Sequence, residues 1–240
     1  MLEIIPVPVL TDNYVWLIHD AKSGETAALD PSVAEPVIDA AAAKGLRLTQ
    51  VLNTHWHPDH TGGNEAIQAA TGSTITAPAE ARRVSKVDRI VAEGDRIAVG
   101  GAEAAVWNIP AHTAGHIAYY FEQERMIFVG DTMFAMGCGR LFEGTAEQMF
   151  ANLQRIAALP DDVRIYCGHE YTLANARFAL HVEPENGAVR DRLERARDLR
   201  EEGKVTLPTT VAEERATNPF VRASDAQEFA RLRAEKDSFR

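Results

Sequence analysis

The sequence predicts a mixed α/β fold followed by a helical C-terminal region, and three observations predict it. Short apolar runs rich in branched and aromatic residues alternate with helical stretches through the first part of the chain. From residue 73 to residue 128 such runs follow one another with only turns between them. After His169 the strand signal ends, and residues 171–240 are rich in the helix formers Ala, Arg, Leu and Glu.

The first predicted strands are apolar runs of the length that is typical of strands. They cover residues 3–9, 14–19, 26–30 and 48–53. Between the last two strands, residues 33–44 are rich in Ala with apolar residues at helical spacing, and Gly45 follows where a left-handed helix cap belongs. A second helix is expected over residues 63–70, because Thr71 and Gly72 end the helical pattern.

The middle of the chain predicts short strands joined by turns at Gly94, Gly100 and Pro110. The predicted strands are 74–77, 96–99, 103–109, 117–121 and 126–129. A helix is expected over 145–158, because Thr145 and Gln148 have the spacing of a capping box. One more strand covers 163–167. Breaks at 184–187, 203–208 and 218–219 divide the remaining helical region.

Composition and charge exclude several classes of protein. The 240 residues include 35 Asp and Glu against 25 Lys and Arg, a net charge of −10, so we expect neither a nucleic acid nor a membrane as a partner. The first residues lack the pattern of a secretory signal, and we expect a cytoplasmic protein. Cys138 and Cys167 are too few for a disulfide framework and are expected to be ordinary thiols.

The strongest chemical signal is a run of candidate metal ligands directly after the strand that ends near Asn53. Within six positions the chain carries His55, His57, Asp59 and His60. Loops at strand ends are where α/β proteins build sites, because side chains there converge beyond the sheet. A single His is more often a surface or packed residue, but this run forms no periodic core face, and burying it unpaired would be costly.

Three further candidate ligands follow the ends of later predicted strands, namely His112, Asp131 and His169. The resulting set of five His and two Asp suits Zn²⁺, Fe or Mn²⁺, and the absence of a thiolate set argues against a structural zinc site. Seven ligands exceed the needs of one tetrahedral ion. Two ions that share one carboxylate and a hydroxide account for the number, so the residues themselves indicate a dinuclear hydrolase.

This H-x-H-x-D-H run with the later His, Asp and His resembles the metallo-β-lactamase superfamily, and within it the glyoxalase II (hydroxyacylglutathione hydrolase) family. Further landmarks of that resemblance are 10–14 (LTDNY), 130–132 (GDT), 137–140 (GCGR), 166–171 (YCGHEY), 218–220 (NPF) and 233–237 (RAEKD). The resemblance implies an αβ/βα four-layer sandwich as the catalytic domain, residues 1–169. It also implies a C-terminal helical substrate-binding domain, residues 170–240.

The resemblance implies a role for each of the seven ligands. One metal ion would be held by His55, His57 and His112, and a second ion by Asp59, His60 and His169. Asp131 would bridge the two ions, which are expected to be Zn²⁺, with Fe or Mn²⁺ as alternatives. The implied activity is hydrolysis of S-D-lactoylglutathione to D-lactate and glutathione, the second step of methylglyoxal detoxification, by a hydroxide that bridges the metals. A thiol leaves readily as thiolate, so no proton donor is needed.

The resemblance also implies which residues bind the glutathione part of the substrate. Arg140, Arg233 and Lys236 match family positions that bind glutathione, although the last two also fit a mixed-charge helix face that is simply solvated. Tyr171 would contact the peptide part, or serve as a packed core tyrosine. Phe142 departs from the family, which often has Tyr there, and one hydrogen bond to glutathione is lost with the hydroxyl.

Asp30 matches a superfamily position that supports the metal loop without binding the metal, and the alternative is a turn-forming Asp before Pro31. The histidines His19, His116 and His181 match no ligand position. The rival function is that of a mononuclear-iron persulfide dioxygenase, and another hydrolase of the same fold is a further alternative. Such a dioxygenase uses fewer ligands and generally lacks the long helical tail. We expect the protein to be a monomer.

Overall fold

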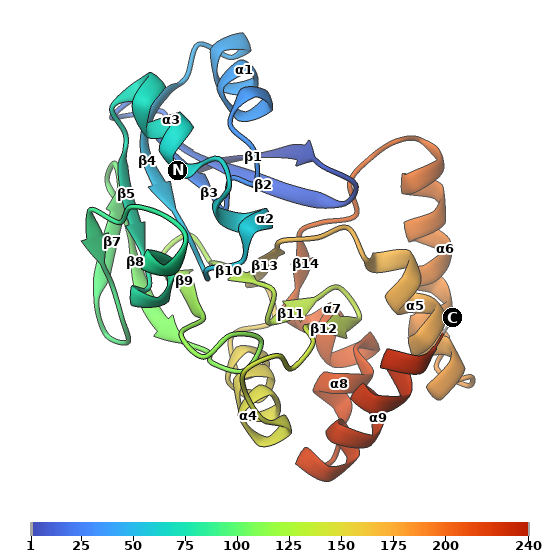
Figure 1. Cartoon of the computed structure of the whole chain (residues 1–240). Helices are drawn as coiled ribbons and strands as arrows, with labels where there is room; N and C mark the ends of the chain where they lie inside the picture. Colours follow the sequence, from blue (N-terminus) through green and yellow to red (C-terminus); the bar gives the residue numbers. More distant parts are fainter. Residues whose placement is uncertain (1, 240) are drawn as a thin grey trace. The chain divides into compact units, whose positions relative to one another are not determined.

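The computed structural model describes residues 2–239, and the chain forms two compact units (Figure 1). Unit 1 comprises Met1–Asn108 and Gly115–Gly130, and unit 2 comprises Ile109–Ala114 and Asp131–Arg240. This division of the chain differs from the predicted domain boundary at residue 169. The reason is that segments before residue 169 pack with the C-terminal helices inside unit 2. The domain boundary at 169 stays a prediction.

Unit 1 contains a six-stranded sheet whose strands follow chain order. The strands are β1 (Leu2–Val9), β2 (Asn13–Asp20), β3 (Glu25–Leu29), β4 (Arg47–Leu52), β5 (Thr74–Ala77) and β6 (Arg89–Ile90). The first three pair antiparallel, and β3 to β6 pair parallel. Parallel neighbours need a crossover connection, and helices α1 (Glu35–Ala43) and α3 (Asn64–Thr71) supply two of them. Val37 and Ala41 of α1 and Ile67 of α3 belong to the same core cluster as the sheet's Val51.

A second, antiparallel run of strands completes unit 1. It consists of β7 (Arg96–Val99), β8 (Ala102–Asn108), β9 (Ile117–Phe121) and β10 (Met126–Gly130). The turn between β7 and β8 is tied to the first sheet, because Gly101 N donates to Asp20 Oδ2 at 3.0 Å and Gly100 N donates to Glu25 Oε2 at 3.0 Å. The hydrogen bonds from the backbone of Gly101 and Lys22 lower the pKa of Asp20 to about 2, which keeps this tie charged at neutral pH.

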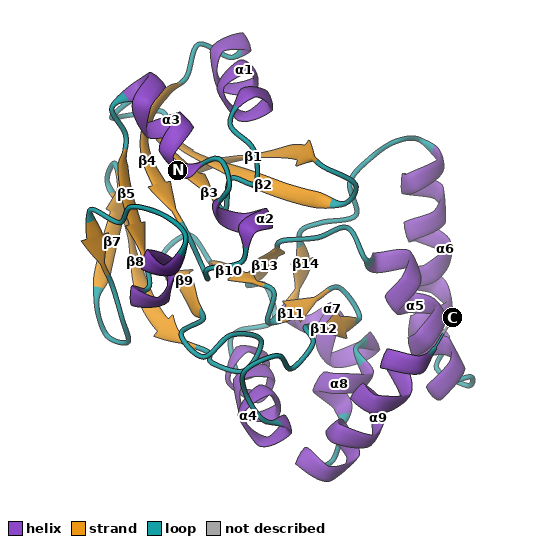
Figure 2. Cartoon of the chain, viewed as in Figure 1, coloured by secondary structure: helices purple, strands orange, loops and turns teal. Residues whose placement is uncertain are grey.

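Unit 2 is mainly helical (Figure 2). Its helices are α4 (Ala146–Ala157), α5 (Thr172–Val182), α6 (Gly187–Glu201), α7 (Val211–Thr217), α8 (Pro219–Arg222) and α9 (Ala226–Ser238). Its strands are β11 (Met133–Phe134), β12 (Gly137–Cys138), β13 (Arg164–Cys167) and β14 (Thr209–Thr210). The predicted capping box forms at α4, since the Thr145 side chain accepts from Gln148 N and the Gln148 side chain accepts from Thr145 N.

The α/β class predicted from the sequence is confirmed, and each predicted strand and long helix lies within one or two residues of its predicted ends. The expectation of no strand after His169 is wrong at β14, which pairs antiparallel with β13. A two-residue strand is too short to show an alternating pattern, so this strand could not be predicted. None of the helices described within residues 2–239 has the length and apolar character needed to span a membrane.

Candidate metal centre

Four of the predicted ligands lie in unit 1, in the loop that leaves β4 and in the short helix α2 (Pro58–Thr61). His57 is the residue before the helix, and Pro58 occupies its first turn, where a proline costs no hydrogen bond. This local turn brings His60 back toward His55. Both of those rings are buried, and their centroids lie 4.2 Å apart.

The ligand atoms within this part of unit 1 lie close together. His55 Nε2 is 3.1 Å from His57 Nδ1, and His60 Nε2 is 3.5 Å from Asp59 Oδ2. Asp30, His55 and His60 also form a group whose candidate ligand atoms all lie within 4.8 Å of one another. Packing a carboxylate and several imidazoles together in a buried place is typical of a cation site.

Asp30 lies in the turn before Pro31 and beside Thr54 and the predicted ligand His60. It has a positive φ of 53° in the turn before Pro31, and it is buried. Its carboxylate accepts from Thr54 N and from Thr54 Oγ1, both at 2.7 Å, and its Oδ2 lies 3.2 Å from His60 Nδ1. Since Nδ1 of His60 faces Asp30, Nε2 is the ring atom directed toward Asp59. Asp30 therefore sets the orientation of the His60 ring.

Three residues near these ligands had no predicted role. Asn13 Nδ2 donates to both the backbone O and Oδ2 of Asp59 at 3.1 Å, and Ser32 Oγ also donates to the Asp59 backbone O. The ring of His116 stacks on His55 with centroids 4.6 Å apart. Asn13 lies within the landmark run 10–14, which was the one available sign. Ser32 and His116 carry no sequence signal of their own.

The other three predicted ligands lie together in unit 2. Asp131 Oδ2 is 3.4 Å from His112 Nε2 and 3.3 Å from His169 Nε2. His112 Nδ1 lies 3.0 Å from the backbone O of Arg140. A carbonyl only accepts hydrogen bonds, so Nδ1 carries the proton and Nε2 is left with a lone pair that faces Asp131.

The distances within each unit fit metal ligation. Two ligand atoms about 2.1 Å from one tetrahedral ion lie about 3.4 Å apart. The pairs of His60 with Asp59, His112 with Asp131, and His169 with Asp131 are separated by 3.5, 3.4 and 3.3 Å. The donor chemistry of neutral imidazole with carboxylate suits a divalent cation. Each unit thus presents a set of His and Asp groups suited to binding metal ions.

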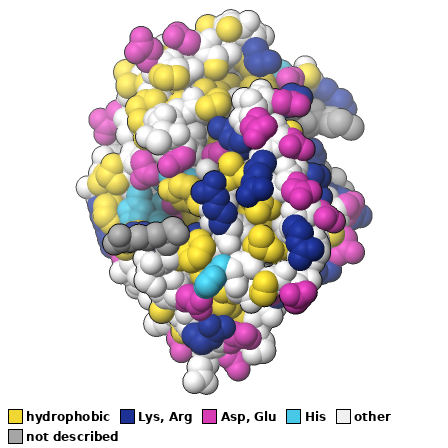
Figure 3. All heavy atoms as spheres, turned by 90° about the vertical axis from the view of Figure 1, so that its right-hand side faces the viewer, with side chains coloured by type: hydrophobic (Ala, Val, Ile, Leu, Met, Phe, Trp, Pro, Cys, Tyr) yellow, Lys and Arg dark blue, Asp and Glu magenta, His cyan; other side chains and the backbone are white. Residues whose placement is uncertain are grey.

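The predicted glutathione-binding cations also lie in unit 2, and two of them share a partner. Arg233 Nη2 lies 2.8 Å from Asp237 Oδ1, and Arg140 Nε lies 3.7 Å from the same atom. Arg233 is only 7% exposed, which excludes the solvated helix face considered for it. Lys236 Nζ donates to Ala174 O at 3.1 Å. Side chains of both charges are mixed on the face shown in Figure 3.

The two aromatic residues predicted to contact the substrate lie against ligand rings. Tyr171 stacks on His169 with ring centroids 4.7 Å apart and an angle of 4° between the rings. Phe142 meets His112 edge to face at 5.2 Å, and 60% of it is exposed. An exposed phenylalanine beside a ligand gives the apolar surface that a substrate wall needs. Tyr171 therefore both packs in the structure and lies next to His169, one of the predicted metal ligands.

Both cysteines are buried free thiols, as expected. Burial raises the pKa of Cys138 to about 11, and burial raises the pKa of Cys167 further. Thiols with raised pKa values carry almost no thiolate at neutral pH, which is typical of ordinary buried cysteines.

The substitution Asp30→Asn is expected to weaken metal binding by about 10- to 100-fold, because it removes the charge that orients the His60 ring. The metal dissociation constant, measured by competition with a chelator of known affinity, checks this. Asp39→Asn, at an exposed position of α1, serves as the control and is expected to leave metal binding unchanged. Equal metal affinity in both variants would mean that Asp30 only forms the turn before Pro31 and does not affect metal binding.

Comparison with known proteins agrees with this arrangement. The family model described as the metallo-beta-lactamase superfamily matches residues 11–169. The family model described as the hydroxyacylglutathione hydrolase C-terminus matches residues 170–239. The two matches together cover nearly the whole chain, and the seven predicted metal ligands all lie in the first.

Relatives of known name and relatives of solved structure each match 91% of the chain or more. A hydroxyacylglutathione hydrolase of Methylococcus capsulatus is 49% identical over 255 residues, with 100% of both chains covered. The crystal structure of ETHE1 from Myxococcus xanthus has a TM-score of 0.75 and 26% identity, covering 100% of this chain and 92% of its own. The structure of TTHA1623 in a di-iron-bound form has a TM-score of 0.65 and 21% identity, covering 91% of this chain and 99% of its own.

Proposed function

The chain belongs to the hydroxyacylglutathione hydrolase family of the metallo-β-lactamase superfamily, and we propose that its His and Asp groups hold two metal ions for the hydrolysis of a glutathione thioester. It is a hydrolase whose substrate is S-D-lactoylglutathione and whose products are D-lactate and glutathione. The observation that best supports this activity is the match of residues 170–239 to the hydroxyacylglutathione hydrolase C-terminus. The fold alone hosts several activities and would not decide it.

We propose the metal ligands that the sequence predicted. One ion takes His55, His57, His112 and Asp131, and the other takes Asp59, His60, His169 and Asp131. The spacing of 3.3 to 3.5 Å between His and Asp atoms within each unit supports this assignment. Zn²⁺ is the proposed ion, and Fe or Mn²⁺ would suit the same donors. When bound, such ions lower the pKa of a water molecule and polarise a carbonyl oxygen.

The protein's own groups prepare the ligands for that chemistry. The Arg140 carbonyl fixes the His112 tautomer, so that its Nε2 lone pair is available. Asp30 holds the His60 ring, and Asn13 holds the Asp59 carboxylate, each from outside the ligand set. Because a thiol leaves as thiolate without prior protonation, Asp59 is free to act as a ligand and need not donate a proton.

We propose that the glutathione part of the substrate binds in unit 2. Its carboxylates would pair with Arg140, Arg233 and Lys236, and its peptide would contact Tyr171 and Phe142. The common neighbour Asp237 holds the Arg233 side chain rigid, which lowers the entropy lost when a substrate carboxylate binds nearby. The exposed Arg140 side chain remains accessible to a carboxylate.

The pH dependence of substrate binding is expected to report Lys236. Burial, together with the neighbouring Arg233 charge, lowers the pKa of Lys236 to about 8. The ammonium is therefore charged below pH 8 and neutral above it, so the attraction for a carboxylate falls as pH rises. KM for the thioester is expected to increase about 5-fold between pH 7 and pH 9.

The matched variant for this prediction is Lys236→Arg, whose guanidinium stays charged across the same range. Its KM is expected to stay flat over these pH values. Steady-state kinetics of both proteins on one buffer series check this. Parallel KM profiles for wild type and Lys236→Arg would mean that Lys236 does not bind the substrate.

The substitution Phe142→Tyr is expected to restore the hydrogen bond that the family tyrosine provides. One added hydrogen bond is worth about 0.5–1.5 kcal/mol, so KM should fall about 2- to 10-fold while kcat stays unchanged. Phe150→Tyr, a half-buried phenylalanine on α4, is the matched control and should leave KM unchanged. An unchanged KM in Phe142→Tyr would place residue 142 outside the glutathione contacts.

The experiment that tests the proposed function is hydrolysis of S-D-lactoylglutathione by the purified protein, with thioester loss followed and metals counted in the same sample. A His57→Ala variant is expected to lose turnover together with metal. Thioester stability in the presence of two bound metals would overturn the proposal. Oxygen uptake with glutathione persulfide would then identify the rival dioxygenase activity. The monomeric state and the cytoplasmic location stay predictions.

A further inference from the structure

The helices of unit 2 direct side chains onto one short hairpin, β11 and β12, which follows Asp131 in the chain. Four helical or helix-capping residues make hydrogen bonds to its backbone. Three of them donate to carbonyl oxygens of the hairpin: Asn175 of α5 to Ala135 O (3.1 Å), Asn218 before α8 to Phe134 O (3.3 Å) and Gly137 O (3.0 Å), and Arg233 of α9 to Cys138 O (2.9 Å). The fourth, Glu214 of α7, accepts a hydrogen bond from Met136 N (3.0 Å). The hairpin is held mainly from outside, since its own strands have two residues each.

Asn218 and Glu214 belong to a buried network of hydrogen bonds and one ion pair. Asn218 and Glu214 are at most 1% exposed, and Asn218 Nδ2 also donates to Glu214 Oε2 at 2.8 Å. The Glu214 charge is balanced by buried Arg192 at 2.7 Å. Buried networks of this kind fix one geometry, because any displacement leaves polar groups without partners in a medium of low dielectric constant.

The hairpin turn has a backbone conformation that the surrounding helices maintain. Met136 has a φ of 56°, a region that non-glycine residues rarely adopt. Its N–H donates to Glu214, and its side chain packs with Ala176 and Leu193 of the α5–α6 cluster. A strained residue persists when its surroundings over-determine its conformation.

The residues that follow the hairpin contact two of the proposed metal ligands, Asp131 and His112. Gly139 N donates to Thr132 O at 3.2 Å, which closes the segment back onto the residue after Asp131. A Cβ at Gly139 would collide with Asp131 O and lie 3.1 Å from His112 Nδ1, so only glycine allows this close approach. The next residue, Arg140, accepts the His112 Nδ1 proton. The hairpin position thus decides where the Asp131 backbone and the His112 ring lie.

We propose that Asn218 and Glu214 are positioning residues of the metal centre, and that the C-terminal helices orient Asp131 and His112 by holding the β11–β12 hairpin. The helical region then has a task in metal binding besides its role toward the substrate. This inference rests on the proposed function only in taking Asp131 and His112 as metal ligands. It predicts that a contact among helices, remote from any substrate group, changes metal affinity.

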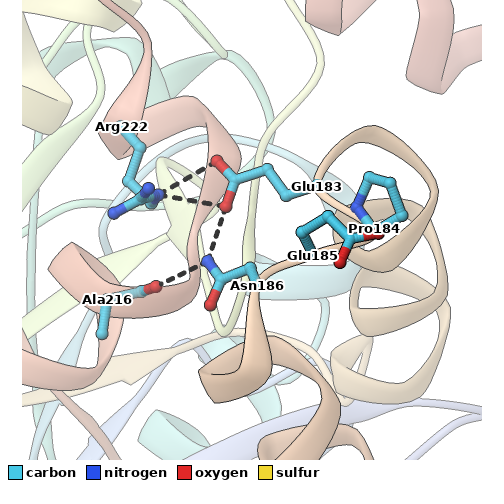
Figure 4. Close-up of a pocket in the computed structure, with 6 residues that line it drawn as sticks. All are labelled: Glu183, Pro184, Glu185, Asn186, Ala216 and Arg222. Atoms are coloured by element: carbon cyan, nitrogen blue, oxygen red, sulfur yellow. Dashed lines mark hydrogen bonds and ion pairs between the residues drawn. The ribbon is translucent and has the colours of Figure 1, made fainter.

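The test compares Asn218→Ala with the matched control Asn186→Ala. Asn186 caps α6, lines a surface pocket (Figure 4), and donates to Ala216 O at 3.1 Å and to Glu183 Oε2, and within the described residues 2–239 its side chain makes no hydrogen bond to residues 133–138. Each variant removes a buried or capping asparagine that bonds to a backbone carbonyl, so both should lower the melting temperature. Asn175→Ala, which removes only the Ala135 contact, is the second variant should Asn218→Ala fail to fold.

The readout is the dissociation constant for Zn²⁺, measured by competition with a chromogenic chelator. Asn218→Ala is expected to bind zinc about 10-fold more weakly, with kcat restored by excess zinc and KM for the thioester unchanged. Asn175→Ala should show a smaller loss, and Asn186→Ala should match wild type. Equal zinc affinity in Asn218→Ala, Asn175→Ala and Asn186→Ala would overturn the proposal.

The zinc measurement separates this inference from the proposed function. Wild-type protein that binds zinc tightly but leaves the thioester intact would contradict the activity, while the zinc affinities of the variants would still test the positioning role. Wild-type protein that hydrolyses the thioester normally, with unaltered zinc affinity in the asparagine variants, would contradict the positioning role alone.

Discussion

Replacing Asp131 with Asn is expected to lower kcat/KM for the thioester by about 1000-fold or more. The carboxylate lies 3.3 to 3.4 Å from the ring nitrogens of His112 and His169, and an amide of the same shape supplies no charge to a shared cation. Loss of several kcal/mol of electrostatic stabilisation corresponds to a rate loss of this size. Steady-state kinetics, with the metal content of each sample determined, measure it.

The control for this substitution is Asp161→Asn, an exposed carboxylate that pairs with Arg215 at the surface. It should change kcat/KM less than 2-fold, because exposed ion pairs contribute little. Both variants should give the wild-type circular dichroism spectrum, since Asn occupies the same volume as Asp. Near-normal turnover by Asp131→Asn would show that no metal ion depends on this residue.

Replacing Glu214 with Leu is expected to lower the free energy of unfolding by about 3–5 kcal/mol. The substitution leaves Arg192 as a buried charge without its 2.7 Å partner and removes the acceptor for Met136 N. Urea denaturation followed by tryptophan fluorescence measures the loss. Glu202→Ala, which breaks the exposed pair with Lys204, should cost about 0–1 kcal/mol and is the matched control.

The double variant Arg192→Met with Glu214→Leu separates charge from packing. Removing both charges takes away the unpaired guanidinium, so the double variant should recover part of the stability lost in Glu214→Leu. The Asn218 and Met136 contacts remain absent, and full recovery is not expected. A loss in Glu214→Leu no larger than in Glu202→Ala would mean that the buried pair does not stabilise the fold.

Much of the fold could be predicted from the sequence because most elements carry a local signal. The strand at 74–77 and the helix at 146–157 are examples, since the first is a bounded apolar run and the second begins with a capping box. The hairpin of residues 133–138 and strand β14 could not be predicted. Their two-residue strands show no periodicity, and their geometry is set by side chains far along the chain.

Some residues of the candidate site could likewise be predicted from the sequence, and others could not. The ligands from His55 to His60 are adjacent in sequence, so their chemistry is visible in a single run. The residues that hold them are not, because Ser32 and Asn13 contact Asp59 across 27 and 46 positions of the chain. Asp30 was found only through the family resemblance. Contacts between distant side chains leave no pattern that a single sequence reveals.

Arg233 shows how burial changes the meaning of a charge. In the sequence it lies among alternating charges that are typical of a solvated helix face. In the structure it is buried, its Nη1 donates to Cys138 O, and its guanidinium lies 5.3 Å from the centre of the Phe220 ring. An arginine in such a place stabilises the hairpin, in addition to any role in binding a substrate carboxylate. The sequence alone could not assign it that first role.

The most direct measurement of the central claim is a titration of the metal-free enzyme with Zn²⁺, following S-D-lactoylglutathione hydrolysis and bound zinc together. If the seven proposed His and Asp ligands hold two ions, activity should reach its plateau only when two ions are bound per chain. Asp59→Ala, which removes a ligand of one proposed ion, should bind about one ion and stay far below wild-type turnover. Full activity with a single bound ion per chain would contradict the account.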